Sequence, residues 1–408
     1  MESPHQPAAQ PTQPRGPLII IGASARAAAQ SALRAGYEPW CIDLFADRDL
    51  RAIAPVKRCP RQAWPNGVLE LMKDAPPGPV LLTGAMENHL EIVDEIYRQR
   101  PTLTHPPAPL DQPLHAMSRV RAPTAFLRAL GSQVADSNDW PSIPRVMTSM
   151  PWYRRRWRRL VPGRNRWLVK PMHGAGGRGI RFWRPGERLA RNHYLQEFIE
   201  GVPVSAVFVL IDGEPILAGA TEQIIGDADF GAAGFHYAGN VGPFPLTPSL
   251  ASQFQAIAAG LAAMEPLAFR QGVMGIDAIV STRGGAGKAS VFPVEVNPRY
   301  VASVEVLERF ADRSLLMISL LAGHPVPPIL PVDGSQFGKA VIHARRRCRA
   351  GDLSQGQEHA IADVPDPGEV FEPGQPVCTV FARGSTRDAC FAGLRAMAEK
   401  VYTRLVPA

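Results

Sequence analysis

A lysine followed by a cluster of glycines is the feature that most limits how this 408-residue chain can fold. The segment 167–180 reads WLVKPMHGAGGRGI, in which an apolar strand ends at Lys170 and a glycine-rich loop leads into a second strand. Glycines let backbone N–H groups close over phosphate oxygens, and the lysine adds positive charge. The lysine precedes the glycines and no helix follows, so this is not a Walker A loop. We predict a phosphate-covering hairpin, with a plain flexible β-hairpin as the alternative.

Acidic residues interrupt two apolar stretches further along the chain. Asp277 lies within 273–280, and Glu295 and Asn297 lie within 291–299. Glu295 and Asn297 are two positions apart, so their side chains share one face of a strand. A carboxylate in an apolar setting needs a partner, and Mg²⁺ prefers oxygen ligands of this kind. We predict that the three residues hold Mg²⁺, with Mn²⁺ as a substitute; structural pairing with arginines is the alternative.

Between these two signals lies the segment 194–205, which reads as a strand, a turn and a second strand. An apolar strand with a polar edge can hold an adenine ring through backbone hydrogen bonds and the side chain of Glu197. An ordinary core strand explains the same pattern.

The N-terminal part of the chain follows the pattern of a doubly wound α/β domain. We expect a strand at 18–21, a helix at 25–35 and a strand at 38–43, followed by a strand at 79–83 and a helix at 89–98. Ser24 begins the first helix, where it could bind an anionic substrate group or simply cap the helix.

Four units are expected along the chain. They are a disordered leader at 1–16, an α/β domain at 17–113, a mixed α+β domain at 114–330, and a β-rich C-terminal module with a terminal helix at 331–408. The glycine-rich loop at 230–242 contains His236, which could contact substrate.

Composition excludes several classes of protein. Apolar residues make up 45% and charged residues 20%, a balance typical of globular domains, and no run is long enough to cross a membrane. The leader lacks the pattern of a signal peptide, and the five cysteines form no CxxC pair, so we expect a cytoplasmic protein with reduced cysteines. The net charge of +7 is compatible with binding to nucleic acid or to a polyanion such as ATP.

The segment 152–159 is rich in Arg and Trp. We interpret it as a solvated insertion or a substrate lid in preference to a nucleic-acid patch.

Together and in this order, the three central segments resemble the ATP-grasp superfamily, whose members bind ATP between two α+β subdomains. The resemblance covers about 117–309 and implies that Lys170 contacts the nucleotide phosphates, that the glycines cover them, and that Arg299 contacts the reacting phosphate or carboxylate. It also implies a magnesium site at Asp277, Glu295 and Asn297. The glycines of the cover are Gly174, Gly176, Gly177 and Gly179, and the adenine-reading hinge is Glu197, Phe198 and Ile199.

The flanking segments resemble one branch, the predicted ATP-dependent carboligases related to biotin carboxylase. The loop 84–88, which contains Glu87, resembles the end of that branch's first domain, and 363–378 resembles its C-terminal module. Glu87, Ser24 and His236 are therefore candidate substrate residues. The resemblance also implies that relatives are often homodimers and act in the biosynthesis of pterin or furan one-carbon carriers.

The chain departs from the family pattern at three places. Arg119 stands where many relatives have a first nucleotide-binding lysine, and Val204 and Ser205 stand where an acid often holds the ribose. Val301 and Ser303 replace the glutamine and glutamate that biotin carboxylases present to bicarbonate.

These departures disfavour carboxylation, and we predict a ligase that phosphorylates a small carboxylate with ATP and joins it to an amine through an acyl phosphate. ATP-dependent carboxylation is the second interpretation. A nucleotide-binding regulatory or RNA-associated protein is the third, although we expect neither nucleic acid nor a membrane as a partner.

Overall fold

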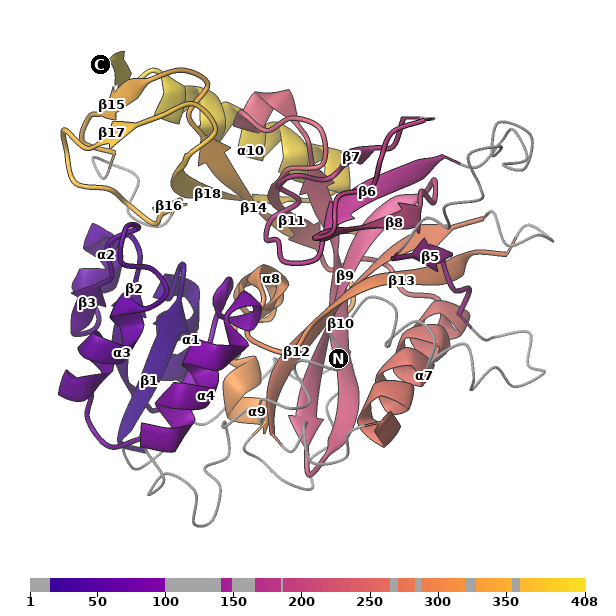
Figure 1. Ribbon diagram of the computed structural model, residues 1–408. Coiled ribbons are helices and arrows are strands. Elements are labelled where there is room, and N and C mark those ends of the chain that lie inside the picture. Colours follow the sequence, from indigo (N-terminus) through magenta and orange to yellow (C-terminus); the bar gives the residue numbers. More distant parts are fainter. Residues whose placement is uncertain are drawn as a thin grey trace, which may run out of the picture.

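The computed structural model describes residues 15–99, 141–148, 166–184, 186–264, 271–282, 288–319, 328–353 and 360–408. Within these residues the strands form four sheets, which are arranged around a shared centre (Figure 1). Arg119, the segment 152–159 and nearly all of the 1–16 leader lie outside the described residues.

The N-terminal domain is a parallel four-stranded sheet in the order β3-β2-β1-β4, with helices on its faces. Its first strand is buried on both faces: Leu18 and Ile20 belong to one core, and Ile19 and Ile21 to another. The predicted strands and helices at 17–43 and 79–99 are confirmed. The elements are β1 (Pro17–Gly22), α1 (Arg26–Arg34), β2 (Glu38–Asp43), α2 (Arg48–Arg51), β3 (Val56–Arg58), α3 (Gly67–Leu71), β4 (Val80–Leu82) and α4 (Leu90–Gln99).

A small antiparallel sheet in the order β5-β8-β6-β7 carries the glycine-rich loop. The loop connects β6 to β7, as the sequence predicts. The strands are β5 (Val146–Met147), β6 (Trp167–Pro171), β7 (Arg181–Phe182) and β8 (His193–Glu197).

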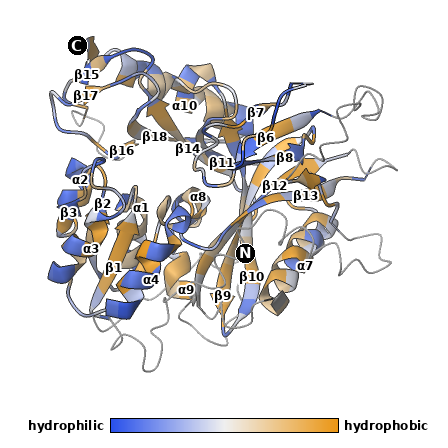
Figure 2. Ribbon diagram, in the orientation of Figure 1, coloured by the Kyte–Doolittle hydropathy of each residue, from blue (hydrophilic) through white to orange (hydrophobic). Residues whose placement is uncertain are grey.

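The largest sheet is antiparallel and has eight strands in the order β13-β12-β9-β10-β11-β14-β18-β16. Helix α7 (Pro248–Met264) covers one face, and α8 (Ala302–Ala311) and α9 (Leu315–Ser319) pack between the other face and the N-terminal domain. In Figure 2 the strands of this sheet carry much of the hydrophobic colour. The strands are β9 (Val202–Ile211), β10 (Glu214–Ile225), β11 (Tyr237–Gly242), β12 (Gln271–Ser281), β13 (Ser290–Asn297), β14 (Gln336–His343), β16 (Ile361–Ala362) and β18 (Pro376–Gly384).

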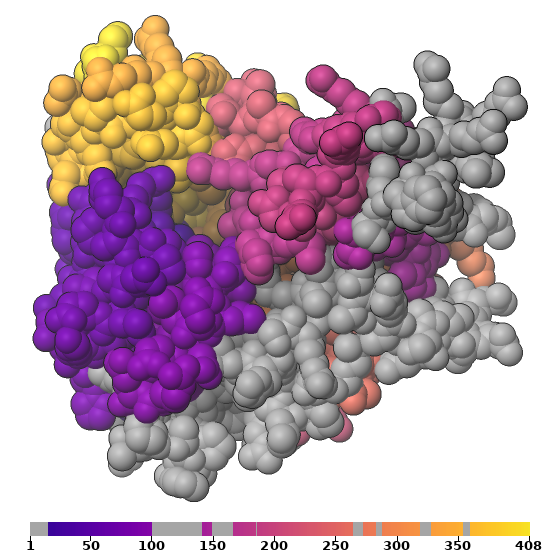
Figure 3. Space-filling model, in the orientation of Figure 1, coloured from indigo at the N-terminus to yellow at the C-terminus, as the bar shows by residue number. Residues whose placement is uncertain are grey.

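The C-terminal segment is joined to the rest of the molecule in two ways. Strand β14 pairs with β11, so the large sheet crosses the predicted boundary at 330/331, and α10 (Arg387–Tyr402) packs on its end. A three-stranded sheet in the order β17-β15-β19 completes the segment. Its strands are β15 (Cys348–Ala350), β17 (Val370–Phe371) and β19 (Leu405–Pro407). The C-terminal segment also meets the N-terminal domain on one face of the molecule (Figure 3). There Arg48 and Arg51 form ion pairs with Asp352 and Asp366.

Two expectations about the chain's chemistry can be compared with the structure. All five cysteines are free and buried, as predicted. In the described part of the chain no helix is long and apolar enough to cross a membrane.

Candidate active site

A cleft of about 350 Å³, here called the central cleft, lies between the β5-β8-β6-β7 sheet, called the small sheet below, and the eight-stranded sheet, called the large sheet. Its small-sheet side is formed by β6, β8 and the glycine-rich loop, and its large-sheet side by β9 to β13. Every residue that the sequence assigned to nucleotide or metal binding within the described residues lines this cleft, except Gly179. Segments that are far apart in the sequence are therefore brought to one place.

Lys170 ends the predicted strand, and its side chain is held in the cleft. The residue is 8% exposed, and its Nζ donates a hydrogen bond to Gln196 Oε1 at 2.9 Å. The buried amide nitrogen of Gln196 has no hydrogen-bond partner among the described residues. A ligand in the cleft could accept from both groups. Sequence reasoning missed Gln196, whose signal is a polar residue inside a segment already predicted as a strand.

The glycine-rich loop is folded over the cleft in a conformation that only glycine adopts easily. Gly176, Gly177 and Gly179 have φ angles of 60°, 73° and 79°. A Cβ atom on Gly177 would lie 1.8 Å from the backbone oxygen of Phe235, and Gly176 accepts a hydrogen bond from the Tyr237 amide at 3.0 Å. The loop is thus docked on the segment that leads into β11. Gly174, Gly176 and Gly177 line the cleft.

The predicted hinge at the end of β8 also lines the cleft, but part of its hydrogen-bonding capacity is used within the protein. The Glu197 carboxylate accepts a hydrogen bond from Arg145 Nε at 3.0 Å, and the backbone amide of Glu197 donates one to the Arg145 carbonyl. The Phe198 amide donates to the Arg166 carbonyl. Glu197 therefore anchors the hinge, and Ile199 contributes an apolar wall.

The predicted metal ligands come together on two adjacent strands. Asp277 of β12 and Glu295 of β13 are cross-strand partners, and Asn297 Nδ2 donates to Asp277 Oδ2 at 3.0 Å. Burial and the nearby Glu295 raise the pKa of Asp277 to about 6, although Ser205 and Gln223 hydrogen-bond its charged form. Two carboxylates that repel each other beside an amide are a donor set suited to a divalent cation. The residues present therefore fit Mg²⁺.

Arg299 lines the cleft, and Glu87 of the N-terminal domain holds its side chain. Its Nη2 pairs with Glu87 Oε1 at 2.7 Å and donates to Asn297 Oδ1 at 3.0 Å. Glu87 belongs to a short 3-10 helix, Met86–Asn88, after β4, and is 3% exposed. Glu87 lines the cleft and its carboxylate positions Arg299, while the predicted contact with substrate stays a prediction.

A second cavity of about 260 Å³, the junction pocket, opens beside Arg299 where the three parts of the chain meet. It shares Tyr237, Arg299, Val301 and Ala302 with the central cleft. Its other lining residues come from the loops after β1, β2 and β4, from the start of α1, from Tyr300 after β13 and from the C-terminal segment.

Ser24 and His236 were also predicted to contact substrate, and only Ser24 lines one of the two cavities. Ser24 lines the junction pocket, with its hydroxyl 3.5 Å from Asp363 Oδ1; the cap position of α1 is Ala25, whose amide donates to Asp43. His236 lies in the lining of neither cavity. Its ring accepts from Arg178 Nε at 3.2 Å and lies 4.5 Å from the His343 ring at a tilt of 42°, so it supports the loop, and the predicted substrate contact stays a prediction.

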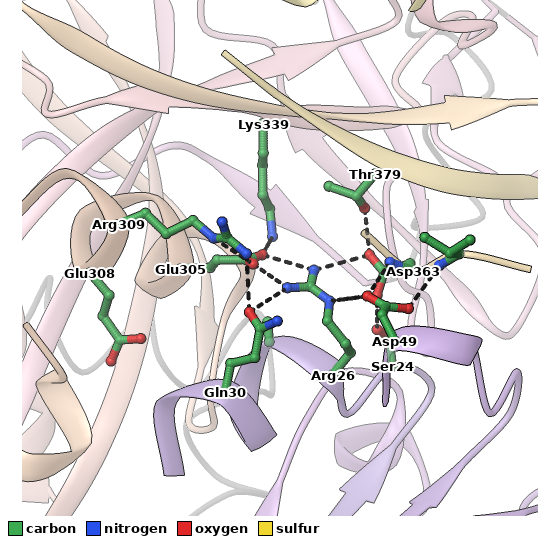
Figure 4. Close-up of polar contacts among 12 residues, drawn as sticks. Ser24, Arg26, Gln30, Asp49, Glu305, Glu308, Arg309, Lys339, Asp363 and Thr379 are labelled. Atoms are coloured by element: carbon green, nitrogen blue, oxygen red, sulfur yellow. Dashed lines mark hydrogen bonds and ion pairs between the residues drawn. The ribbon is translucent and has the colours of Figure 1, made fainter. Parts of the chain in front are cut away.

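The floor of the junction pocket is a buried charge network (Figure 4). Arg26 donates to both carboxylate oxygens of Glu305 and to both of Asp363, and Lys339 Nζ lies 3.0 Å from Glu305 Oε2. Burial opposes the charge on Glu305, but Arg26, Lys339 and Arg309 outweigh it and hold the pKa of Glu305 well below its usual range. The network joins all three parts of the chain, and the sequence analysis did not identify it.

The central part of the chain has two facing sheets and a glycine loop, as expected from its resemblance to the ATP-grasp superfamily. Residues 142–303 match the family model of the ATP-grasp domain. The chain thus contains an ATP-grasp domain, which is accompanied by a parallel N-terminal sheet and by antiparallel sheets.

Solved structures share this architecture along nearly the whole chain. L-amino acid ligase from Bacillus licheniformis is 13% identical with a TM-score of 0.65, over 97% of this chain and 98% of the other. N5-carboxyaminoimidazole ribonucleotide synthetase from Thermus thermophilus is 18% identical with a TM-score of 0.62, over 94% and 98%. Biotin carboxylase from Campylobacter jejuni is 13% identical with a TM-score of 0.65, over 95% and 91%. At these identities the likeness shows the fold.

An uncharacterized protein of Methanocaldococcus jannaschii is 25% identical over 229 residues. The match covers 53% of this chain, and the chain spans about half the length of that relative, 50%.

Proposed function

We propose that this protein is an ATP-dependent ligase that activates a carboxylate as an acyl phosphate and joins it to an amine. The observation that carries the proposal is the position of Arg299, which lines both the central cleft and the junction pocket. A nucleotide in the cleft and a second molecule in the pocket would meet at this guanidinium.

The central cleft offers a site for each part of ATP. Lys170 and the glycine-rich loop would bind the phosphates, as a cation and as a cover that excludes water. Glu197, Phe198 and Ile199 would border the adenine. Proteins of the same fold have been solved in complex with ADP and with ATP, which supports the proposal that this cleft binds a nucleotide.

Asp277, Glu295 and Asn297 would hold Mg²⁺ against the phosphate oxygens. When bound, the cation would neutralise charge on the phosphates. The raised pKa of Asp277 supports this assignment, because a cation would relieve the repulsion from Glu295.

The chain's own residues would act by positioning and by stabilising charge. A carboxylate oxygen attacks the γ-phosphorus, the bond to the β-phosphate oxygen breaks, and ADP leaves. The amine then attacks the acyl carbon, inorganic phosphate leaves, and the amine proton passes to phosphate or water. Arg299 would stabilise the charge on the transferred phosphoryl group, while Glu87 and Asn297 keep its guanidinium oriented.

The lining beside Arg299 favours ligation over carboxylation. Val301 and Ser303 line the cleft at the positions where the resemblance to biotin carboxylases leads us to expect a glutamine and a glutamate. An alkyl group and a hydroxyl group supply neither the amide nor the carboxylate expected to handle bicarbonate.

The test is ADP release by the purified protein with Mg²⁺ and ATP, against pools of carboxylates with and without pools of amines. Pterin and furan precursors belong in the first pools, as the resemblance implies. ADP release that needs both substrates, and that falls at least 100-fold in Lys170→Ala and Glu295→Ala, is expected. Lys73→Ala is the matched control, because Lys73 is exposed and pairs only with Glu70 in the described structure. Bicarbonate-dependent turnover, or equal turnover in all four proteins, would contradict the proposal.

A further inference from the structure

The junction pocket connects the central cleft to the protein surface. It shares Arg299 with the cleft, and it shares Phe45, Glu369 and Phe371 with a shallow groove on the outside. Asp47 lines the pocket but neither the cleft nor the groove. A molecule in the pocket would therefore reach the reacting centre at one end while contacting Asp47 away from it.

Asp47 has an unusual lack of partners for a carboxylate in this position. It is the cap residue of α2, where an aspartate normally accepts hydrogen bonds from the first helical amides, but its side chain makes no such bond. Within the described residues no hydrogen bond or ion pair holds its carboxylate, although half-buried acids usually acquire one.

The surrounding acids are all satisfied, which makes the contrast sharper. Asp363 accepts from Arg26 and Thr379, Asp49 accepts from the amides of Asp363 and Val364, and Asp43 accepts from three backbone amides. Burial, together with the charges of Asp363, Asp43 and Asp49, raises the pKa of Asp47 to about 9. A bound cation would relieve this repulsion among the acids.

A second polar group in the same pocket also lacks a partner. Thr83 is 3% exposed, lines the pocket, and its hydroxyl oxygen makes no hydrogen bond with any described residue. A buried hydroxyl without a partner costs about 1–3 kcal/mol, which a bound ligand would offset. The lining also includes Phe45 and Phe371, which are suited to cover an alkyl or aromatic chain or to face a cation.

We propose that the junction pocket binds a substrate carrying a primary ammonium group, which pairs with Asp47 at a distance from the group that reacts beside Arg299. Phe45 and Phe371 would contact the chain between the two groups, and Thr83 would hydrogen-bond a polar atom of it. This proposal rests on the ligase function proposed above and specifies the chemical class of one substrate.

The experiment is isothermal titration of the full-length protein, in the presence of ADP, with three probes: 6-aminohexanoate, L-lysine and 2-phenylethylamine. Each is compared with the derivative acetylated on its terminal amino group, which keeps the carbon chain, removes the positive charge and adds a small acyl group. At least one amine is expected to bind at least tenfold more tightly than its acetylated form. Failure of all three amines to bind, or equal binding of the acetylated forms, would overturn the proposal.

Variants localise the effect to the pocket. Asp47→Asn keeps the shape of the side chain and is expected to weaken amine binding at least tenfold while ADP affinity stays the same. Thr83→Val, a second and independent variant, is expected to weaken it severalfold. Asp366→Asn removes the same charge at the same interface but outside the pocket, and is expected to bind as the wild type does. Unchanged amine binding in both Asp47→Asn and Thr83→Val would refute the assignment.

The two proposals fail in different ways. If amines bind through Asp47 and ATP binds in the cleft but no ADP is released with any pool, the ligase function fails and the ammonium site remains. If ADP release requires an amine but does not depend on Asp47, the ligase function remains and the ammonium site fails.

Discussion

Arg26 of α1 and Glu305 of α8 form a buried, doubly hydrogen-bonded ion pair although 279 positions separate them in the sequence. Helix α1 belongs to the N-terminal domain, and α8 follows the last strand of the ATP-grasp domain. Asp363 and Lys339 extend the pair into the C-terminal segment. The pair therefore fixes the relative positions of the three parts that form the junction pocket.

Removing the charge of Glu305 should destabilise the whole molecule. In Glu305→Gln, Lys339 and part of Arg26 lose their counter-charge in a buried setting, which typically costs about 3–5 kcal/mol. Urea unfolding followed by circular dichroism measures the change. Arg387→Gln breaks the partly exposed pair with Glu222 and should cost less than about 1 kcal/mol. Equal costs in the two variants would mean that the network is not a structural link.

The glycine loop should tolerate a methyl group at one position and not at the next. Gly176→Ala and Gly177→Ala both place alanine at positive φ, which costs about 1–2 kcal/mol. Only the Gly177 methyl group would also collide with the Phe235 carbonyl, since nothing lies within 4 Å at Gly176. We expect ATP affinity to fall at least tenfold more in Gly177→Ala than in Gly176→Ala, measured by titration. Similar affinities would show that docking of the loop on Phe235 is not needed for binding.

Glu87→Gln should separate the orientation of Arg299 from nucleotide binding. Glu87 pairs with Arg299 at 2.7 Å and would not touch ATP in the proposed arrangement, so the rate of ADP release should fall about 10–100-fold with little change in ATP affinity. Glu87→Asp, which keeps the charge, should recover part of the rate. A large loss of ATP affinity with an unchanged rate would contradict this role.

Stability should fall in mildly acidic solution because of His343. Burial, together with the neighbouring His236, lowers its pKa in the folded protein to about 4, against about 6.5 in the unfolded chain. Between these values the unfolded chain binds more protons, so unfolding becomes easier as pH falls from about 6.5 towards 4. The contribution approaches about 1.4 kcal/mol per pH unit.

The variant His343→Gln isolates that contribution. Its unfolding free energy, measured in urea between pH 7.5 and 5, should decline less steeply than that of the wild type. Parallel curves for the two proteins would show that His343 gains its proton as easily in the folded state as in the unfolded state.

Much of the fold was predictable because it depends on local patterns. Short apolar runs and the helical pattern between them identified β1, α1 and β2 to within one or two residues, and the run from Lys170 to Ile180 identified the loop that covers the cleft. The spacing of Glu295 and Asn297 predicted that both lie on one side of a strand, and both residues line the central cleft.

Other features depended on contacts between distant segments. Asp277 and Glu295 become neighbours through strand register, and Glu87 becomes the partner of Arg299 only when the N-terminal domain packs against the large sheet. Gln196 was missed for the same reason, and so was the contact of His236 with His343, a histidine more than a hundred residues away.

The sequence by itself determined the order of helices and strands, the glycine loop and the set of groups that can bind phosphate and a divalent cation, because each follows from periodicity or from the chemistry of neighbouring residues. The tertiary structure alone decided where these groups meet, which charges are paired and that Asp47 is left without a partner. Burial, ion pairing and cavity shape arise from three segments packing together, and no single stretch of sequence contains that information.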